Sequence, residues 1–126
     1  MPLLAIDTNA ELSSREKNHI SNTLTTLYAE EMETTSGHIA VVIRDHARSA
    51  LSLGRSVPGP LVFLDADVRT GRPFDQRRRF ALAVIEWFIE ELAIPRENLK
   101  IVFTEHEGEQ MMGADRVGGA WSPEED

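Results

Sequence analysis

Apolar residues along this chain occur either in short continuous runs or in stripes with helical spacing. The runs predict four main strands, over residues 3–8, 39–43, 61–68 and 99–104. Between the first two, Ser13 and Glu16 have the spacing of a capping box, and the stripe behind them predicts a helix over 14–32. Between the last two, Pro73 suits the first position of a second helix, which Pro95 ends. The intervening loop has room for a short strand near 50–53.

The second half of the chain repeats the first. Residues 60–65 echo 2–7, and residues 101–106 echo 41–46, in the same order and with offsets of about 60. This repeat predicts two similar β-α-β units, at about 2–46 and 60–106, within one domain over 1–126. Right-handed crossovers place both helices on one face of the sheet. The expected fold class is therefore α+β, with a four-stranded mixed sheet and two helices on one face.

The strands read as apolar throughout, without clean alternation of apolar and polar positions. Strands with this pattern are usually covered on both faces. Two helices on one face leave the other face bare, so we expect an oligomer in which the sheets of several subunits cover one another.

Composition narrows the functional classes. The chain has 126 residues and no cysteine, which excludes disulfides, thiol catalysis and cysteine-bound zinc and suits a reducing compartment such as the cytoplasm. A net charge of −8 argues against nucleic-acid binding, and no apolar run approaches the length of a membrane span. No two of the four histidines have zinc-motif spacing, so no metal site is predicted.

Pro2 is the first candidate for chemistry. Removal of Met1 would leave Pro2 with a free secondary amine, a compact base or nucleophile, whereas proline within a chain has no basic nitrogen. The alternative is that Pro2 only begins an edge strand. Pro60 follows Gly59 and is an amide in either case.

Arg69 and Arg72 directly follow the third strand. If the two units are related by a pseudo-two-fold axis, the start of the first strand lies near the end of the third, which brings both arginines toward Pro2. Arginine is suited to bidentate binding of a carboxylate, and neighbouring cations lower the pKa of an amine. Pro73 biases Arg72 toward an extended conformation, which makes Arg72 the preferred candidate. The alternative is a turn with two solvated arginines.

Three further residues are candidates for substrate binding. His38 precedes the second strand, Tyr28 lies on the apolar face of the first helix, and Phe103 lies in the last strand. A structural role is the alternative for each. His106, among three glutamates, is interpreted as part of a solvated acidic turn rather than a metal ligand.

Taken together, the proline behind Met1, the duplicated β-α-β pattern and the arginine pair resemble the tautomerase superfamily over nearly the whole chain. The stretch His38–Val42 and the pair Ile94-Pro95 resemble the macrophage migration inhibitory factor group. The opening Met1–Leu4 resembles malonate semialdehyde decarboxylase. Arg69 and Arg72 match the substrate-binding arginines of cis-3-chloroacrylic acid dehalogenase.

The chain also departs from those groups. Tyr28 stands where the dehalogenase has a histidine, Val102 and Gly113 stand where it has a tyrosine and a glutamate, and Ser36-Gly37 replaces the decarboxylase's aspartate. What the resemblance implies is a homotrimeric, cofactor-free tautomerase. In it, Pro2 is the general base and Arg72 with Arg69 binds a small 2-oxo acid. Two alternatives remain open: a decarboxylase or hydratase of short acids that uses protonated Pro2, and a trimeric binding protein without activity.

Overall fold

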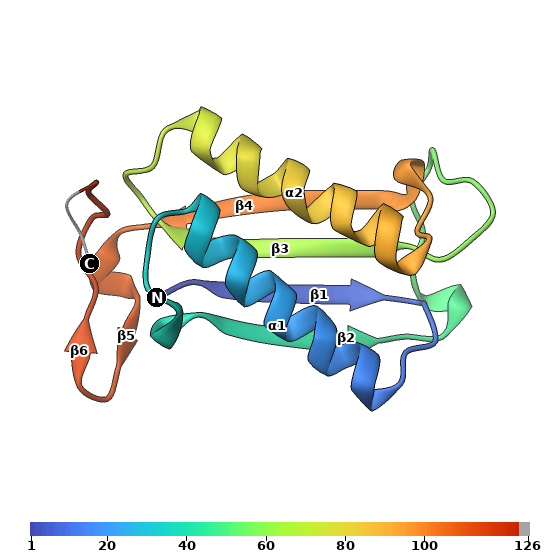
Figure 1. The fold of residues 1–126 in the computed structure, drawn as a ribbon, viewed down its shortest axis with the longest axis horizontal. Coiled ribbons are helices and arrows are strands. Elements are labelled where there is room, and N and C mark those ends of the chain that lie inside the picture. The colour runs from blue at the N-terminus through green and yellow to red at the C-terminus, as the bar shows by residue number, and fades with distance from the viewer. Residues whose placement is uncertain (124–126) are drawn as a thin grey trace.

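The computed structural model describes residues 1–123 and forms two layers, a sheet and a pair of helices (Figure 1). The strands of the sheet are β1 (Leu3–Thr8), β2 (Ala40–Asp45), β3 (Val62–Arg69) and β4 (Leu99–His106). The helices are α1 (Ser14–Glu31) and α2 (Phe74–Leu92). A small hairpin, β5 (Met112–Gly113) with β6 (Arg116–Val117), follows β4.

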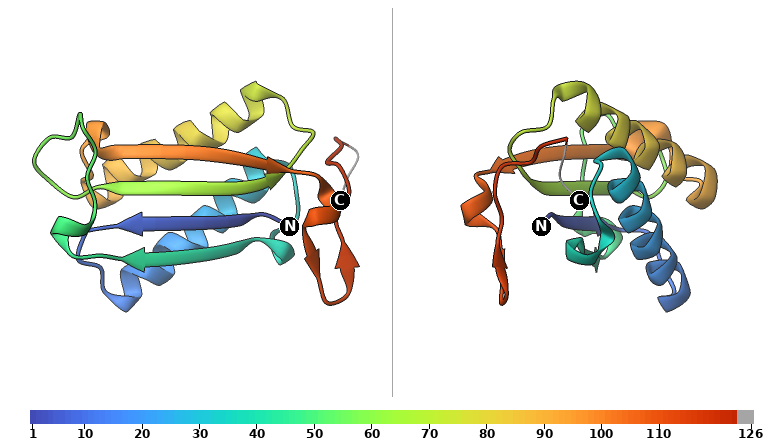
Figure 2. Two further views of the ribbon diagram at one scale, coloured as in Figure 1. Left: turned by 180° about the vertical axis from the view of Figure 1, so that it is seen from behind. Right: turned by 60° about the vertical axis from the view of Figure 1, so that its left-hand side comes forward.

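The sheet has the order β2-β1-β3-β4. β1 and β3 are antiparallel in the centre, and each is parallel to the outer strand of its own unit. Both helices cover the same face, and the β5–β6 hairpin extends from the end of the sheet on the opposite side (Figure 2). The predicted mixed sheet with two helices on one face is confirmed.

Pairing within the sheet defines how the two units correspond. Leu3 pairs with Ala40 and Val62 with Leu99, so partners lie 37 positions apart in both units. Residues 101–106 follow their counterparts 41–46 by 60 positions. Because the pairing within each unit is the same, each residue of β3 also follows its counterpart in β1 by 60 positions. The structural counterpart of Asp7 is Asp67, two residues beyond the aspartate at position 65 that the sequence echo suggested.

Local signals define the helix ends. The Ser13 side chain accepts a hydrogen bond from the Glu16 N–H at 3.1 Å, and the Glu16 carboxylate accepts one from the Ser13 N–H at 2.9 Å, so the predicted capping box is present. At the other helix Pro73 is the N-cap and α2 begins at Phe74, one residue later than predicted. Residues 48–50 form a 3₁₀ turn, and no strand is present at 50–53.

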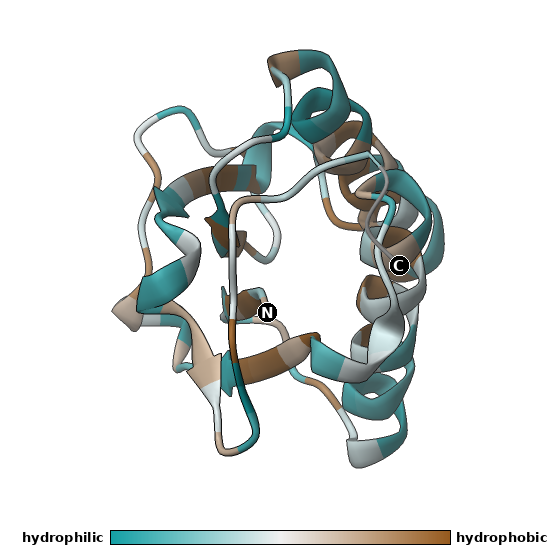
Figure 3. Ribbon diagram, turned by 90° about the vertical axis from the view of Figure 1, so that its left-hand side faces the viewer, coloured by the Kyte–Doolittle hydropathy of each residue, from teal (hydrophilic) through white to brown (hydrophobic). Residues whose placement is uncertain are grey.

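The core lies between the helices and the sheet. Viewed along the strands, the two helices form a layer beside the sheet, and apolar segments occur in both layers (Figure 3). Tyr28 of α1 and Phe80 of α2 meet edge to face at 5.2 Å between ring centroids. The residues around them are fully buried: Leu4, Ile6, Ile20, Leu24, Val68, Val84 and Phe88.

The other face of the sheet is polar at many positions. Asp65 and Thr104 are exposed there, beside the half-buried Asp67, and exposure alternates along β3 and β4. The expectation that the strands lack alternation is therefore wrong for β3 and β4, whereas exposure does not alternate regularly along β1 and β2. The charged residues at alternate positions of long apolar runs face away from the helices. Leu3 and Val102 remain as exposed apolar side chains on this face, at 41% and 47%.

Neither of the described helices has the length and hydrophobicity that a bilayer crossing requires.

Candidate functional site

Pro2 lies at the end of the sheet where β1 begins and β3 ends. Leu3 pairs with Asp67 across the central strands, which places Pro2 beside the last residues of β3. Pro2 is buried, and its carbonyl accepts a hydrogen bond from the Ala40 N–H at 3.0 Å. The predicted approach of the two strand ends is confirmed.

Two cavities meet at Pro2, and both are also lined by Met1 and His38. One is a narrow cleft of about 20 Å³, whose other lining residues are Thr34, Thr35, Arg69, Arg116 and Gly118. The other is an open cavity of about 570 Å³, whose further lining residues are Leu3, Ala40, Asp67, His106, Gln110, Met111 and Met112. The volume of the open cavity suits a small molecule.

Arg69 belongs to the cleft. Its side chain is 5% exposed, and one terminal nitrogen donates to the Gly119 carbonyl at 2.9 Å. The cross-strand partner of Arg69 is His106 of β4. The fold therefore places a guanidinium close to Pro2, as the pseudo-two-fold argument predicted.

Arg72 is set back from both cavities. Its Nε donates to the Met32 carbonyl at 2.8 Å, and its guanidinium lies between two aromatic rings, 4.8 Å from the Trp121 centroid and 5.6 Å from that of Tyr28. The preceding Gly71 has φ +125°, and a Cβ there would lie 2.7 Å from the Trp121 carbonyl oxygen. Only glycine combines that φ with so close an approach. Arg72 thus holds the chain near Trp121 against the helix layer.

His38 is brought to Pro2 by the turn before β2. Its Nε2 lies 3.0 Å from a terminal nitrogen of Arg116 in the β5–β6 hairpin. A guanidinium only donates hydrogen bonds, so the His38 nitrogen is the acceptor and the ring is neutral in this arrangement. His38 and Arg116 therefore form a polar rim that joins the first unit to the hairpin.

Tyr28 and Phe103 lie elsewhere. Tyr28 is 1% exposed within the core, where it contacts Phe80 and the Arg72 guanidinium. Phe103 faces the helix side of β4, 6.3 Å from Phe80, and lines a separate cavity of about 460 Å³ along the outer edge of α2. The structure brings neither side chain into the two cavities at Pro2.

The sequence reading missed several cavity residues. Asp67 and His106 lie side by side, with His106 Nε2 2.8 Å from an Asp67 oxygen. The internal repeat could have identified this pair, because Asp67 and His106 each lie 60 positions after Asp7 and His46 in the sequence. No sequence motif marked Arg116. The short β5–β6 hairpin brings this arginine to the site, and its neighbours in the sequence give no sign of that position.

Within residues 1–123, no three or more histidine or acidic side chains are arranged to hold a metal ion.

No protein-family model and no curated protein matches this chain, but its three-dimensional structure matches solved structures closely. One is N1, a member of the cis-3-chloroacrylic acid dehalogenase family, with TM-score 0.85 and 23% identity over 94% of this chain and 84% of the other. The chain has the fold of the tautomerase superfamily.

Two further neighbours extend this likeness. The FG41 malonate semialdehyde decarboxylase inhibited by 3-bromopropiolate has TM-score 0.76 and 16% identity, over 87% of each chain. Q0, a fused 4-OT symmetric trimer, has TM-score 0.81 and 13% identity, over 92% of this chain and 94% of the other. At these identities, the likeness shows the fold, and the chemistry has to be argued from the residues themselves.

Proposed function

We propose that this protein is a cofactor-free tautomerase that interconverts the enol and keto forms of a small 2-oxo acid. Pro2, freed by removal of Met1, is the general base at carbon. The observation that carries the proposal is the position of Pro2, at the junction of two cavities and beside the buried Arg69. The fold shared with known tautomerase-superfamily enzymes supports it.

Proton abstraction beside a carbonyl needs a base that is uncharged near neutral pH. A free α-amino group has a pKa of about 8, and burial and nearby cations both lower it. Pro2 is buried, and Arg69 and Arg116 line the same cleft. These surroundings favour the neutral amine that accepts a proton.

The substrate also needs a cationic site, because the chain as a whole is acidic. Arg69 contributes a guanidinium at the cleft, where it binds the carboxylate and stabilises the developing enolate. Arg72 does not line either cavity, and its contacts with Trp121 and the Met32 carbonyl support the chain next to this site instead. His38 and Arg116 line the rim of the same site.

The assembly that we propose is a homotrimer. The neighbouring fused 4-OT protein is a symmetric trimer. This chain carries apolar side chains on the uncovered face of the sheet and on the hairpin, with Leu3, Val102, Met112 and Val117 all more than 40% exposed. Contact between subunits would cover them.

The test is the variant Pro2→Ala, compared with the parent after intact mass has established whether Met1 is present. We expect kcat/KM for a 2-oxo acid enol to fall at least about tenfold, or about 1.4 kcal/mol of transition-state stabilisation. A primary amine still accepts a proton, so some activity remains. Full activity in protein that retains Met1 would disprove the proline mechanism.

A pH–rate profile separates this proposal from the decarboxylase or hydratase alternative. In the keto-to-enol direction, followed as exchange of the proton at carbon, a general base loses activity as the pH falls through its pKa. Decarboxylation or hydration that uses protonated Pro2 as an acid instead loses activity as the pH rises. The decarboxylase among the structural neighbours makes this comparison worthwhile. Absence of turnover over a panel of oxo acids would instead indicate a binding protein.

A further inference from the structure

The open cavity at Pro2 contains a hydrogen-bonded carboxylate–imidazole pair, Asp67 with His106, that the proposed function has not used. His106 Nε2 and an Asp67 oxygen are 2.8 Å apart, and the two side chains are 34% and 26% exposed. Both line the cavity together with Pro2. An ionised carboxylate only accepts hydrogen bonds, so Nε2 carries the proton and Nδ1 of the neutral ring is an acceptor.

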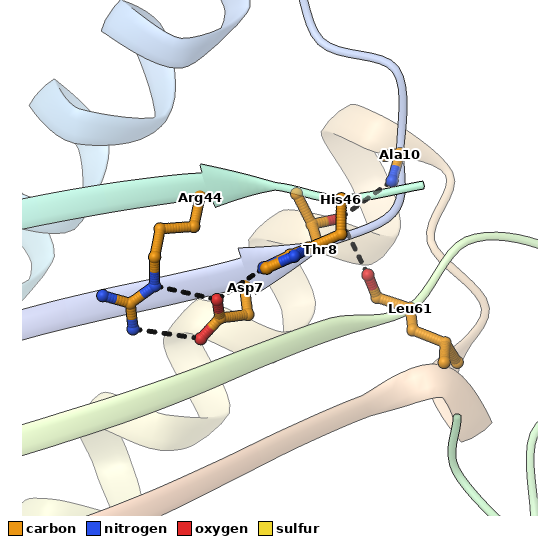
Figure 4. Close-up of polar contacts among 6 residues, drawn as sticks. All are labelled: Asp7, Thr8, Ala10, Arg44, His46 and Leu61. Atoms are coloured by element: carbon orange, nitrogen blue, oxygen red, sulfur yellow. Dashed lines mark hydrogen bonds and ion pairs between the residues drawn. The ribbon is translucent and has the colours of Figure 1, made fainter. Parts of the chain in front are cut away.

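The same pair occurs a second time, at the other end of the sheet. His46 Nε2 lies 2.7 Å from an Asp7 oxygen, and the two residues of each pair are 39 positions apart (Figure 4). Asp7 and Asp67 correspond through the internal repeat, as do His46 and His106. The duplicated fold thus provides an internal comparison between two pairs of like geometry.

The two pairs differ in the residue that lies across the sheet from the aspartate. Asp7 is paired with Arg44, whose guanidinium donates two hydrogen bonds to the carboxylate at 2.9 and 3.2 Å (Figure 4). These bonds lower the pKa of the Asp7 carboxyl below its ordinary value. At the equivalent position Asp67 has Thr104 as its neighbour, and His106 is its one side-chain partner among residues 1–123. Within this part of the chain, the Asp67 carboxylate is therefore free of a competing guanidinium and can orient the His106 ring.

Location separates the pairs further. Asp67 and His106 share a cavity with Pro2, whereas the other pair lies where β1 ends and its aspartate borders a different cavity. Tautomerisation moves two protons, one at carbon and one at oxygen. A second acid–base group that transfers the proton at oxygen would therefore accelerate the reaction beyond what a base at carbon achieves alone.

We propose that His106 is the catalytic residue that exchanges the proton at the substrate oxygen while Pro2 exchanges the proton at carbon, and that Asp67 positions His106. This inference deepens the proposed function and rests on it. In the enol-to-keto direction, Nδ1 takes the hydroxyl proton, the O–H electron pair becomes part of the C=O bond, and the C=C pair takes a proton from the Pro2 ammonium. In the reverse direction, Pro2 takes the proton from carbon and His106 returns one to oxygen. Water carries a proton between His106 and Pro2 to close the cycle, so there is no net gain or loss.

The experiment compares His106→Gln with the matched variant His46→Gln, using an enol of a 2-oxo acid. General acid–base groups typically contribute about 10²–10⁴-fold, so we expect His106→Gln to lower kcat/KM by about a hundredfold or more. His46→Gln is expected to stay within about twofold of the parent. Asp67→Asn is expected to lower kcat at least about tenfold with little change in KM, because it disturbs the orientation of His106 rather than substrate binding.

A second measurement separates chemistry from folding. Added imidazole is expected to restore part of the activity of His106→Ala, because the cavity is open and the lost group is the imidazole itself. Equal activity of His106→Gln and His46→Gln, in an enzyme that Pro2→Ala inactivates, would overturn this inference and leave the proposed function standing. Absence of rescue in a folded His106→Ala protein would likewise overturn it. A parent protein without any turnover would overturn both.

Discussion

Arg69 and Arg72 are three residues apart, yet the fold gives their side chains different surroundings. Arg69 lines the cleft at Pro2, whereas Arg72 is enclosed by Tyr28, Trp121 and the Met32 carbonyl. Cation–π contact of this kind contributes about 0.5–2 kcal/mol, depending on how far the guanidinium is desolvated. The structure thus favours a role in binding for Arg69 and a role in holding the chain together for Arg72.

We expect Arg69→Ala to lower kcat/KM about ten- to a hundredfold more for a carboxylated enol than for its uncharged ester, because a charge-assisted contact is lost. Arg72→Ala is expected to lower the melting temperature by several degrees and to affect both substrates alike. Arg78→Ala, on the exposed face of α2, controls for the loss of one positive charge. Selective loss of the carboxylated substrate in Arg72→Ala would return Arg72 to the binding role that Pro73 suggested.

At the scale of the element, the two helices begin in different ways although they occupy equivalent places in the repeat. Helix α1 has a complete capping box, in which Ser13 and Glu16 satisfy two backbone N–H groups that have no partner within the helix. Helix α2 starts behind Pro73, which has no such side-chain bond. The first helix therefore depends on one short side chain for its start.

Ser13→Ala is expected to destabilise the protein by about 1 kcal/mol, a typical value for the loss of an N-cap. The adjacent Ser14, which is exposed and makes no described side-chain hydrogen bond, provides the control. Ser14→Ala should stay within about 0.5 kcal/mol of the parent. Urea unfolding of the two variants measures this difference, and equal midpoints would show that the capping box contributes little.

At the scale of the whole molecule, one face of the sheet is not covered by a described helix, and its side chains bear on whether the protein assembles. This face combines charged positions with isolated apolar ones, which is a weaker argument for assembly than the continuous apolar face expected from the sequence. The side chains of Leu3 and Val102 are nonetheless exposed on this face. The β5–β6 hairpin extends to the same side of the sheet (Figure 2). Assembly through this side would place neighbouring subunits close to the open cavity.

Sedimentation is expected to give a species of about three times the chain mass of 14.1 kDa. Val102→Lys, on the uncovered face, should shift the protein toward smaller species, because a lysine would have to be buried between subunits. Leu82→Lys replaces a similarly exposed side chain on α2 and should leave the mass unchanged. A stable monomer of the parent protein at micromolar concentration would contradict the proposed trimer.

The sequence by itself determined the elements, their order and the candidate proline, because strand runs, helical stripes and caps are written in nearby residues. Strand orientation also followed, through the internal repeat. Only the tertiary structure decided which polar residues meet at Pro2. His106 was interpreted as part of an acidic turn, and the register of β3 with β4 and of β1 with β3 places it with Asp67 in the same cavity as Pro2. Arg72 was preferred for its local conformation, but contact with Trp121, nearly fifty residues away in the chain, encloses it. Such contacts depend on packing between distant segments, which no local pattern encodes.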